Sequence, residues 1–131
     1  MPFVNIKVAG PTLTPDQILR LQREATRLTA DMMRKKQELT AVLVEQVDDS
    51  RWTVGAAPVR AAAHFDVNVT AGTNTADEKR RFIAEAMQLL RSVIGPALHP
   101  VCYVVVHEVA ADSWGYEGRT QADRTAEAKA A

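Results

Sequence analysis

Cysteine, aromatic residues and net charge are all scarce in this sequence of 131 residues. Its single cysteine, Cys102, excludes an intrachain disulfide and any CxxC redox or zinc motif. Sixteen basic and sixteen acidic residues cancel, and no segment concentrates positive charge, so we expect no nucleic-acid partner. No apolar run reaches membrane-spanning length, and no secretory pattern occurs. We therefore expect a protein that engages no membrane and acts in the cytoplasm.

Histidine is scarce as well, and its placement argues against a metal site. His64, His99 and His107 have neither the mutual spacing of metal ligands nor a nucleophile beside them. We interpret them as ordinary loop and strand-end residues. The sequence thus predicts neither a bound metal nor another cofactor.

Apolar residues, in contrast, make up 47% of the chain. This fraction is ample for one compact core, and the chain is too short to need two independent ones. We expect a single domain over residues 1–131, in which a C-terminal tail at 120–131 forms a frayed helix or an arm.

The first half of the chain has the pattern of a strand, a helix and a second strand. Apolar residues alternate with polar ones over 3–9, which predicts a half-buried strand. A capping box at 14–17, with a proline at the first helical position, begins a helix that ends near Lys36. A second strand is expected over 39–47, followed by a hairpin or extended arm over 52–58.

The second half repeats the first with a shift of 61 residues, which becomes 62 after a one-residue insertion. The pairs include Val4 with Phe65, Ile6 with Val67, Asp16 with Asp77, Leu28 with Leu89, Val44 with Val106 and Trp52 with Trp114. The repeats span residues 2–60 and 61–119. Two right-handed β-α-β units predict an α+β fold with a four-stranded mixed sheet and both helices on one face.

Residues 101–106 are apolar without alternation, which predicts a strand that is buried on both faces. Two helices can cover only one face of such a sheet. Because closed homo-oligomers commonly bury a remaining apolar face, we expect another copy of the chain to cover the other.

Pro2 directly follows the initiator methionine, and its chemistry depends on whether Met1 is removed. Inside a chain the proline nitrogen is neither base nor donor, and Pro2 then merely begins an edge strand. At the amino terminus it is a secondary amine. Terminal amines titrate at roughly 7.7 to 8.0, and burial of the cation lowers the pKa, which suits a general base near neutral pH.

A proline after the initiator methionine that opens two β-α-β repeats resembles the tautomerase superfamily, over residues 2–119. The resemblance implies a homotrimer without cofactors, in which Pro2 is the general base in a pocket between subunits. It also implies an isomerase that interconverts the keto and enol or dienol forms of a small unsaturated 2-hydroxy or 2-oxo acid. Ala63 stands at the place of Pro2 in the second unit, so one proline site per chain is expected.

Individual members of the superfamily match to different degrees. The arginines with which 4-oxalocrotonate tautomerase holds a dicarboxylate are replaced here by Thr12 and Ala41. The substrate lysine of macrophage migration inhibitory factor falls on Lys35, and its pocket tyrosine falls on Tyr103. The resemblance therefore implies that Lys35 binds one carboxylate and that Tyr103 donates a hydrogen bond to the enol oxygen. A helix-end lysine and an interface tyrosine are the alternatives.

Trp52, Trp114 and Arg60 complete the expected substrate site. The tryptophans could supply apolar surroundings for Pro2, or they could be repeat-related residues of the core or of an interface. Arg60 lies in a turn and could replace the missing carboxylate clamp.

Two other functions remain open at this stage. The same amine could serve a hydratase, decarboxylase or dehalogenase of related unsaturated acids, although the missing arginines count against these reactions. The chain could also be a trimeric binding protein without catalytic activity.

Overall fold

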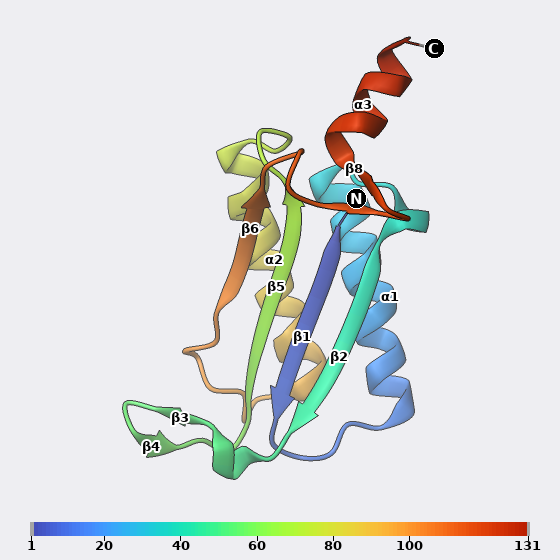
Figure 1. Ribbon diagram of the computed structural model, residues 1–131. Coiled ribbons are helices and arrows are strands. Elements are labelled where there is room, and N and C mark those ends of the chain that lie inside the picture. Colours follow the sequence, from blue (N-terminus) through green and yellow to red (C-terminus); the bar gives the residue numbers. More distant parts are fainter. Residues whose placement is uncertain (1, 131) are drawn as a thin grey trace.

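Four strands and two long helices form two consecutive β-α-β units in the computed structural model, which describes residues 2–130. The first unit contains β1 (Phe3–Ala9), α1 (Pro15–Met33) and β2 (Ala41–Val47). The second contains β5 (Ala62–Thr70), α2 (Ala76–Ile94) and β6 (Val104–Val109). Both helices cover the same face of the sheet (Figure 1).

The sheet has the strand order β2-β1-β5-β6. The strands are parallel within each unit, and the central strands β1 and β5 are antiparallel to each other. Two β-α-β units and a four-stranded mixed sheet with its helices on one face confirm the predicted α+β fold.

Short elements connect and extend the two units. They are the 3-10 turns η1 (Gln37–Leu39) and η2 (Asp49–Arg51), the hairpin strands β3 (Thr53–Val54) and β4 (Ala57–Pro58), the hairpin strands β7 (Gly115–Tyr116) and β8 (Arg119–Thr120), and the helix α3 (Gln121–Ala130). The two hairpins follow their units at opposite ends of the sheet, and α3 projects beyond one end (Figure 1).

Helix α1 begins where the capping box predicts, because the Thr14 hydroxyl accepts a hydrogen bond from the backbone N–H of Gln17, and the Gln17 side-chain oxygen accepts one from the backbone N–H of Thr14. It ends at Met33, before the predicted end near Lys36. The reason is that Arg34 adopts a left-handed conformation with φ of 56°, which terminates the helical hydrogen bonding. The following residues form η1, so β2 starts at Ala41 and not at residue 39.

The hydrophobic core lies between the sheet and the two long helices. At its centre Phe65 of β5 meets Phe82 of α2 edge to face, with ring centroids 5.8 Å apart. Burying a side chain of this size stabilises the fold by roughly 1.5–3 kcal/mol. The largest fully buried side chains also include Ile6, Leu21, Met33, Leu90, Val4, Val8, Val67 and Val69.

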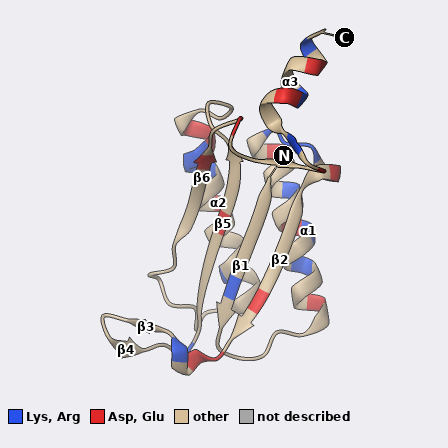
Figure 2. Ribbon diagram, in the orientation of Figure 1, with Lys and Arg blue, Asp and Glu red and all other residues tan. Residues whose placement is uncertain are grey.

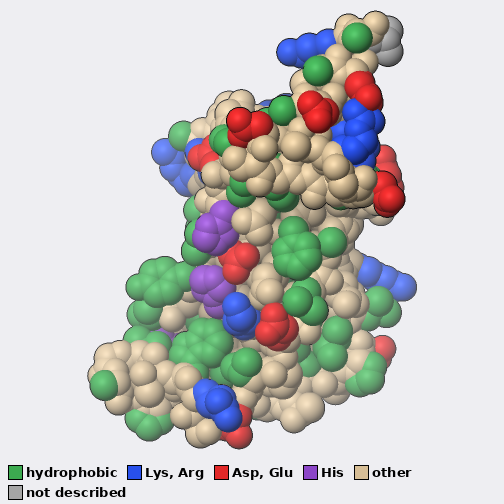
Figure 3. All heavy atoms as spheres, viewed as in Figure 1, with side chains coloured by type: hydrophobic (Ala, Val, Ile, Leu, Met, Phe, Trp, Pro, Cys, Tyr) green, Lys and Arg blue, Asp and Glu red, His purple; other side chains and the backbone are tan. Residues whose placement is uncertain are grey.

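The opposite face of the sheet has no second layer within the described part of one chain (Figure 1). Leu43 and Val101 are 44% and 43% exposed, and Tyr103 is 67% exposed. The expected burial of residues 101–106 on both faces is therefore not achieved by a single chain, and β6 begins only at Val104. Apolar, charged and histidine side chains share this open face (Figure 3). Among residues 2–130, no helix combines the length and the apolar character needed to cross a membrane.

Candidate active site

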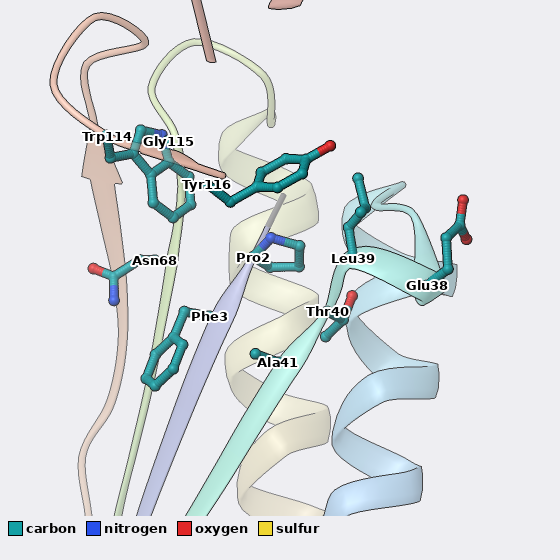
Figure 4. A pocket seen from close by; sticks show the side chains of 10 residues that line it. All are labelled: Pro2, Phe3, Glu38, Leu39, Thr40, Ala41, Asn68, Trp114, Gly115 and Tyr116. Atoms are coloured by element: carbon teal, nitrogen blue, oxygen red, sulfur yellow. The ribbon is translucent and has the colours of Figure 1, made fainter. Parts of the chain in front are cut away.

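A pocket of about 590 Å³ opens at the N-terminal end of β1. Pro2 forms part of its wall, beside Ala41 at the start of β2 and beneath Trp114 and Tyr116 (Figure 4). The segment with β7 and β8 crosses over the start of β1 and so carries both aromatic side chains to this end of the sheet (Figure 1).

Pro2 is buried in this wall and is hydrogen-bonded to the neighbouring strand. Its side chain is less than 2% exposed, and its carbonyl oxygen accepts a hydrogen bond of 3.2 Å from the backbone N–H of Ala41. Met1, whose removal would free the nitrogen of Pro2, lies outside the described residues.

The β7–β8 hairpin positions the two aromatic side chains. Trp114 donates a hydrogen bond of 3.2 Å from Nε1 to Thr70 Oγ1 at the end of β5. The guanidinium carbon of Arg124, on α3, lies 3.7 Å from the centre of the Tyr116 ring, and Arg124 Nη2 donates to the Tyr116 carbonyl oxygen at 3.0 Å. A Cβ atom at Gly115 would overlap the Arg119 carbonyl group, so the tight hairpin requires glycine there.

Apolar groups dominate the surroundings of Pro2. The only acidic side chain that lines this pocket is Glu38, which points away from Pro2 in Figure 4, and no lysine or arginine is among its described lining residues. The charged residues of the chain lie mainly on the helices and turns (Figure 2). A low-polarity environment of this kind favours the neutral form of an amine.

A second cleft, of about 700 Å³, adjoins the first and shares Leu39 and Tyr116 with it. Its cationic lining residues are Arg34, Lys35, Lys36 and Arg124. The Lys35 Nζ atom donates a hydrogen bond of 2.7 Å to Thr73 Oγ1. Burial, and secondarily the positive charge of Arg34, lowers the pKa of Lys35 from its usual value.

The sequence-predicted site residues fall into four places. Pro2 and Trp114 line the same pocket, and Lys35 lines the adjoining cleft. Trp52 and Arg60 flank the β3–β4 hairpin at the opposite end of the sheet, and Arg60 approaches Gly10 at the end of β1 there. Tyr103 lies on the open face of the sheet. A single chain thus brings together two of these residues with a third close by.

Tyr116 and Arg124 were missed by sequence reasoning. The sequence does contain a signal for Tyr116. This residue lies between Gly115 and Gly118, in a turn that follows Trp114. The 52–58 arm follows Trp52, the equivalent tryptophan of the first repeat, in the same way. Arg124 has no such signal. From the sequence, residues 120–131 are an alanine-rich and charged tail that predicts a frayed helix or an arm. In the structure, helix α3 of this segment lines the cationic cleft.

Within residues 2–130, no three His, Cys, Asp or Glu side chains are grouped so that they could hold a metal ion. The functional groups that line the pocket and the adjoining cleft are Pro2, the aromatic side chains and the neighbouring cations.

Comparison with known proteins gives matches over most of the chain. The family model described as "Tautomerase enzyme" matches residues 2–62 and 64–130. A probable tautomerase K2 from Dickeya dadantii (strain 3937) is 33% identical over 55 residues, which cover 42% of this chain and 82% of that protein.

Solved structures with the same fold include a fused 4-OT, described as a symmetric trimer, with a TM-score of 0.80 and 16% identity over 92% of this chain and 96% of that one. The protein Pt0534, inactivated by 2-oxo-3-pentynoate, has a TM-score of 0.81 and 13% identity over 94% and 98% of the two chains. A macrophage migration inhibitory factor-like protein from Entamoeba histolytica has a TM-score of 0.74 and 17% identity over 91% and 97%. At these identities the likeness shows the fold.

The family match extends over both β-α-β units, and the curated relative is a probable tautomerase. Together they show that this chain belongs to the tautomerase family and is an enzyme of the isomerase class.

Proposed function

We propose that the protein is a cofactor-independent tautomerase that interconverts the keto and enol or dienol forms of a small unsaturated 2-hydroxy or 2-oxo acid, with Pro2 as the general base. The observation that carries this proposal is the place of Pro2 in the wall of an apolar pocket, beneath Trp114 and Tyr116. Removal of Met1 turns the amide nitrogen of Pro2 into a secondary amine, which can accept a proton.

The reaction needs one proton carrier. The neutral amine of Pro2 removes the proton from the enol oxygen of the substrate, and the resulting prolinium returns a proton to carbon, so that the substrate gains and loses one proton overall. The apolar pocket disfavours the cationic form and so keeps the amine available as a base. A positioned base of this kind contributes about 10²–10⁴-fold to the rate.

An acid substrate also needs a partner for its carboxylate. Lys35 lies in the adjoining cleft, and we assign it to this role because its ammonium group is half-buried beside the pocket that contains Pro2. The substrate class is supported by Pt0534, which is inactivated by 2-oxo-3-pentynoate, an unsaturated 2-oxo acid. In this proposal, neither proton transfer by Pro2 nor carboxylate binding by Lys35 uses a metal or an organic cofactor.

The proposal includes a homotrimer. Its support is the open sheet face with Phe3, Leu43 and Tyr103, each more than a third exposed, together with the trimeric description of the fused 4-OT proteins of the same fold. Association through this face buries the exposed apolar side chains. We infer that in this assembly Tyr103, Trp52 and Arg60 of a neighbouring copy contribute to the pocket of Pro2.

The test begins with the mass of the purified protein, which shows whether Met1 has been removed. Turnover of phenylpyruvate enol and of 2-hydroxymuconate is then compared between wild type, Pro2→Ala and Pro96→Ala, a control at an exposed proline after α2. We expect Pro2→Ala to lower kcat/KM on the order of 10²-fold or more and Pro96→Ala to leave it unchanged. An active enzyme that retains Met1, or undiminished rates in Pro2→Ala, contradicts the role of Pro2. No turnover by any of the three proteins favours a binding function.

A further inference from the structure

The cationic cleft behind Tyr116 contains Lys36 and Arg124, to which the reaction proposed at Pro2 assigns no role. It adjoins the apolar pocket and shares two wall residues with it, Tyr116 and Leu39. One side of the cleft is formed by Lys35 and its neighbours after α1, and the other side by α3 with Gln121 and Arg124. A ligand that lies against Tyr116 can therefore extend from one compartment into the other.

Arg124 is held in a defined place by Tyr116. Its guanidinium group lies 3.7 Å over the tyrosine ring, and its Nη2 atom donates to the Tyr116 carbonyl oxygen at 3.0 Å. Stacking on an aromatic ring suits the planar, weakly hydrated guanidinium group and limits the rotamers that it can adopt. Arg124 therefore presents its positive charge to the cleft with little freedom left to lose on binding.

Two polar atoms on the same face of α3 are buried without a partner. They are Nε of Arg124 and Oε1 of Gln121, neither of which has a hydrogen bond to any residue from 2 to 130. The two side chains are three residues apart and so lie on one side of the helix. Buried polar atoms without partners are costly and uncommon in folded proteins, and here both belong to residues that line the cleft.

Two of the charged residues that line the cleft, Arg34 and Glu127, are already neutralised by ion pairs. Arg34 forms an ion pair of 2.7 Å with Glu78, and Glu127 is paired with Arg119. Lys35, Lys36 and Arg124, in contrast, take part in no ion pair with a carboxylate among the described residues. The cleft thus retains an excess of positive charge.

We propose that this cleft is a carboxylate-binding subsite of the active centre. Arg124 of α3 selects substrates whose reacting carbon lies at Pro2 and whose carboxylate lies on the other side of Tyr116, in the cleft. The proposal rests on the proposed function, because the reacting carbon is placed at Pro2. The matching substrate is an elongated acid whose unsaturated body contacts Trp114 and Tyr116 and whose carboxylate reaches the cleft. A guanidinium group suits this task because it can donate two parallel hydrogen bonds to one carboxylate.

The test uses two unreactive probes of the same shape, 3-phenylpropanoate and the neutral 3-phenylpropan-1-ol, whose binding to the full-length assembled protein is measured by calorimetry. Wild type should bind the acid more tightly than the alcohol. Arg124→Gln should weaken binding of the acid about tenfold, the loss typical of a hydrogen bond to a charged group, and leave binding of the alcohol unchanged. Lys129→Gln, which removes an exposed cation from the same helix, is the control and should change neither.

Three results would overturn the proposal. Equal affinities of wild type for acid and alcohol would show that the cleft does not recognise a carboxylate. Equal weakening of both probes in Arg124→Gln would mean that Arg124 only supports the shape of the Tyr116 wall. Unchanged binding of both would remove Arg124 from the site. Arg124→Lys keeps the charge without the planar donors and should restore only part of the preference for the acid.

The outcome is separable from the role of Pro2, because neither probe reacts. In Pro2→Ala the preference for the acid should persist even if that variant retains full turnover and the proposed base is thereby rejected. With a reactive acid substrate, Arg124→Gln should raise KM more than it lowers kcat. A change confined to kcat would contradict a binding role.

Discussion

Trp114 is tied to Thr70 by a hydrogen bond of 3.2 Å that joins the β7–β8 hairpin to the end of β5. In the repeat, Trp114 corresponds to Trp52, but Thr70 corresponds to Ala9, which has no hydroxyl group. The first unit therefore cannot anchor its tryptophan in the same way. The anchored copy is the one that lies in the pocket with Pro2.

Thr70→Val should loosen this wall of the pocket. Valine keeps the shape of threonine but leaves the indole N–H without its partner, so we expect a loss of about 1 kcal/mol in the free energy of unfolding and a rise in KM of several-fold. Urea unfolding followed by tryptophan fluorescence and steady-state kinetics measure the two effects. Thr26→Val, which removes a hydroxyl bonded within α1, should leave KM as it is. An unchanged KM in Thr70→Val would show that the bond does not position Trp114 for binding.

Gly115→Ala should damage the pocket through the backbone. A Cβ atom there would overlap the Arg119 carbonyl group, so the β7–β8 hairpin must open and displace Trp114 and Tyr116. We expect a loss of more than about 1 kcal/mol of stability and a larger loss of kcat/KM. Gly118→Asn in the same hairpin is the control, because asparagine tolerates its φ of 74° and no atom lies within 4 Å of a Cβ atom there. Equal activity of both variants would mean that the hairpin does not shape the site.

Lys35→Ala should raise KM for an acid substrate about tenfold, because a charged hydrogen-bond donor is lost. Burial lowers the pKa of Lys35, so the wild-type ammonium loses its charge at a lower pH than an ordinary lysine does. The KM values of wild type and variant should therefore converge as the pH rises through that lowered pKa. Kinetics from pH 6 upward test this, with Lys129→Ala as the control. A constant ratio of KM across the whole pH range would exclude the charge of Lys35 as the cause.

Glu78→Gln should lower stability at neutral pH but not in strong acid. The hydrogen bond from Arg34, followed by the backbone N–H of Thr75, lowers the pKa of Glu78 from 4.5 to about 2. Because its pKa is lower in the folded state, the carboxylate stabilises the protein above about pH 4.5, and this contribution is lost as the pH falls through about 2. Urea titrations at pH 7 and toward pH 2 should show wild type and variant converging in acid.

The control for this experiment is Glu85→Gln, which neutralises an exposed carboxylate on the same helix. It should change the free energy of unfolding by no more than about 0.5 kcal/mol at pH 7. A difference between wild type and Glu78→Gln that stays the same down to pH 2 would contradict the linkage to this ionisation.

Leu43→Glu should dissociate the proposed trimer. Leu43 is 44% exposed on the open face of the sheet, where a buried charge in a subunit contact is strongly unfavourable. Leu19 is similarly exposed, at 40%, but lies on α1, so Leu19→Glu is a matched control that should stay assembled. Sedimentation measures the mass of both variants. A trimer that survives Leu43→Glu but not Leu19→Glu would place the interface on the helices.

Much of this fold was predictable because its signals are local or repeated. The alternation over residues 3–9 and the capping box at Thr14 depend only on neighbouring residues, and the structure matches them closely. The end of α1 was less predictable, since it depends on the left-handed conformation of Arg34, whose side chain binds Glu78 in the second unit. The α+β class followed from the 61-residue repeat, which one strand or helix alone could not reveal.

By itself, the sequence determined the two β-α-β units, the single candidate proline and the family to which they point, because strand period, helix caps and duplication are written along the chain. Only the tertiary structure decided which distant side chains surround Pro2. The antiparallel pairing of β1 with β5 places equivalent parts of the two repeats at opposite ends of the sheet. For that reason Trp114 and Tyr116 cover Pro2, whereas Trp52 lies at the far end.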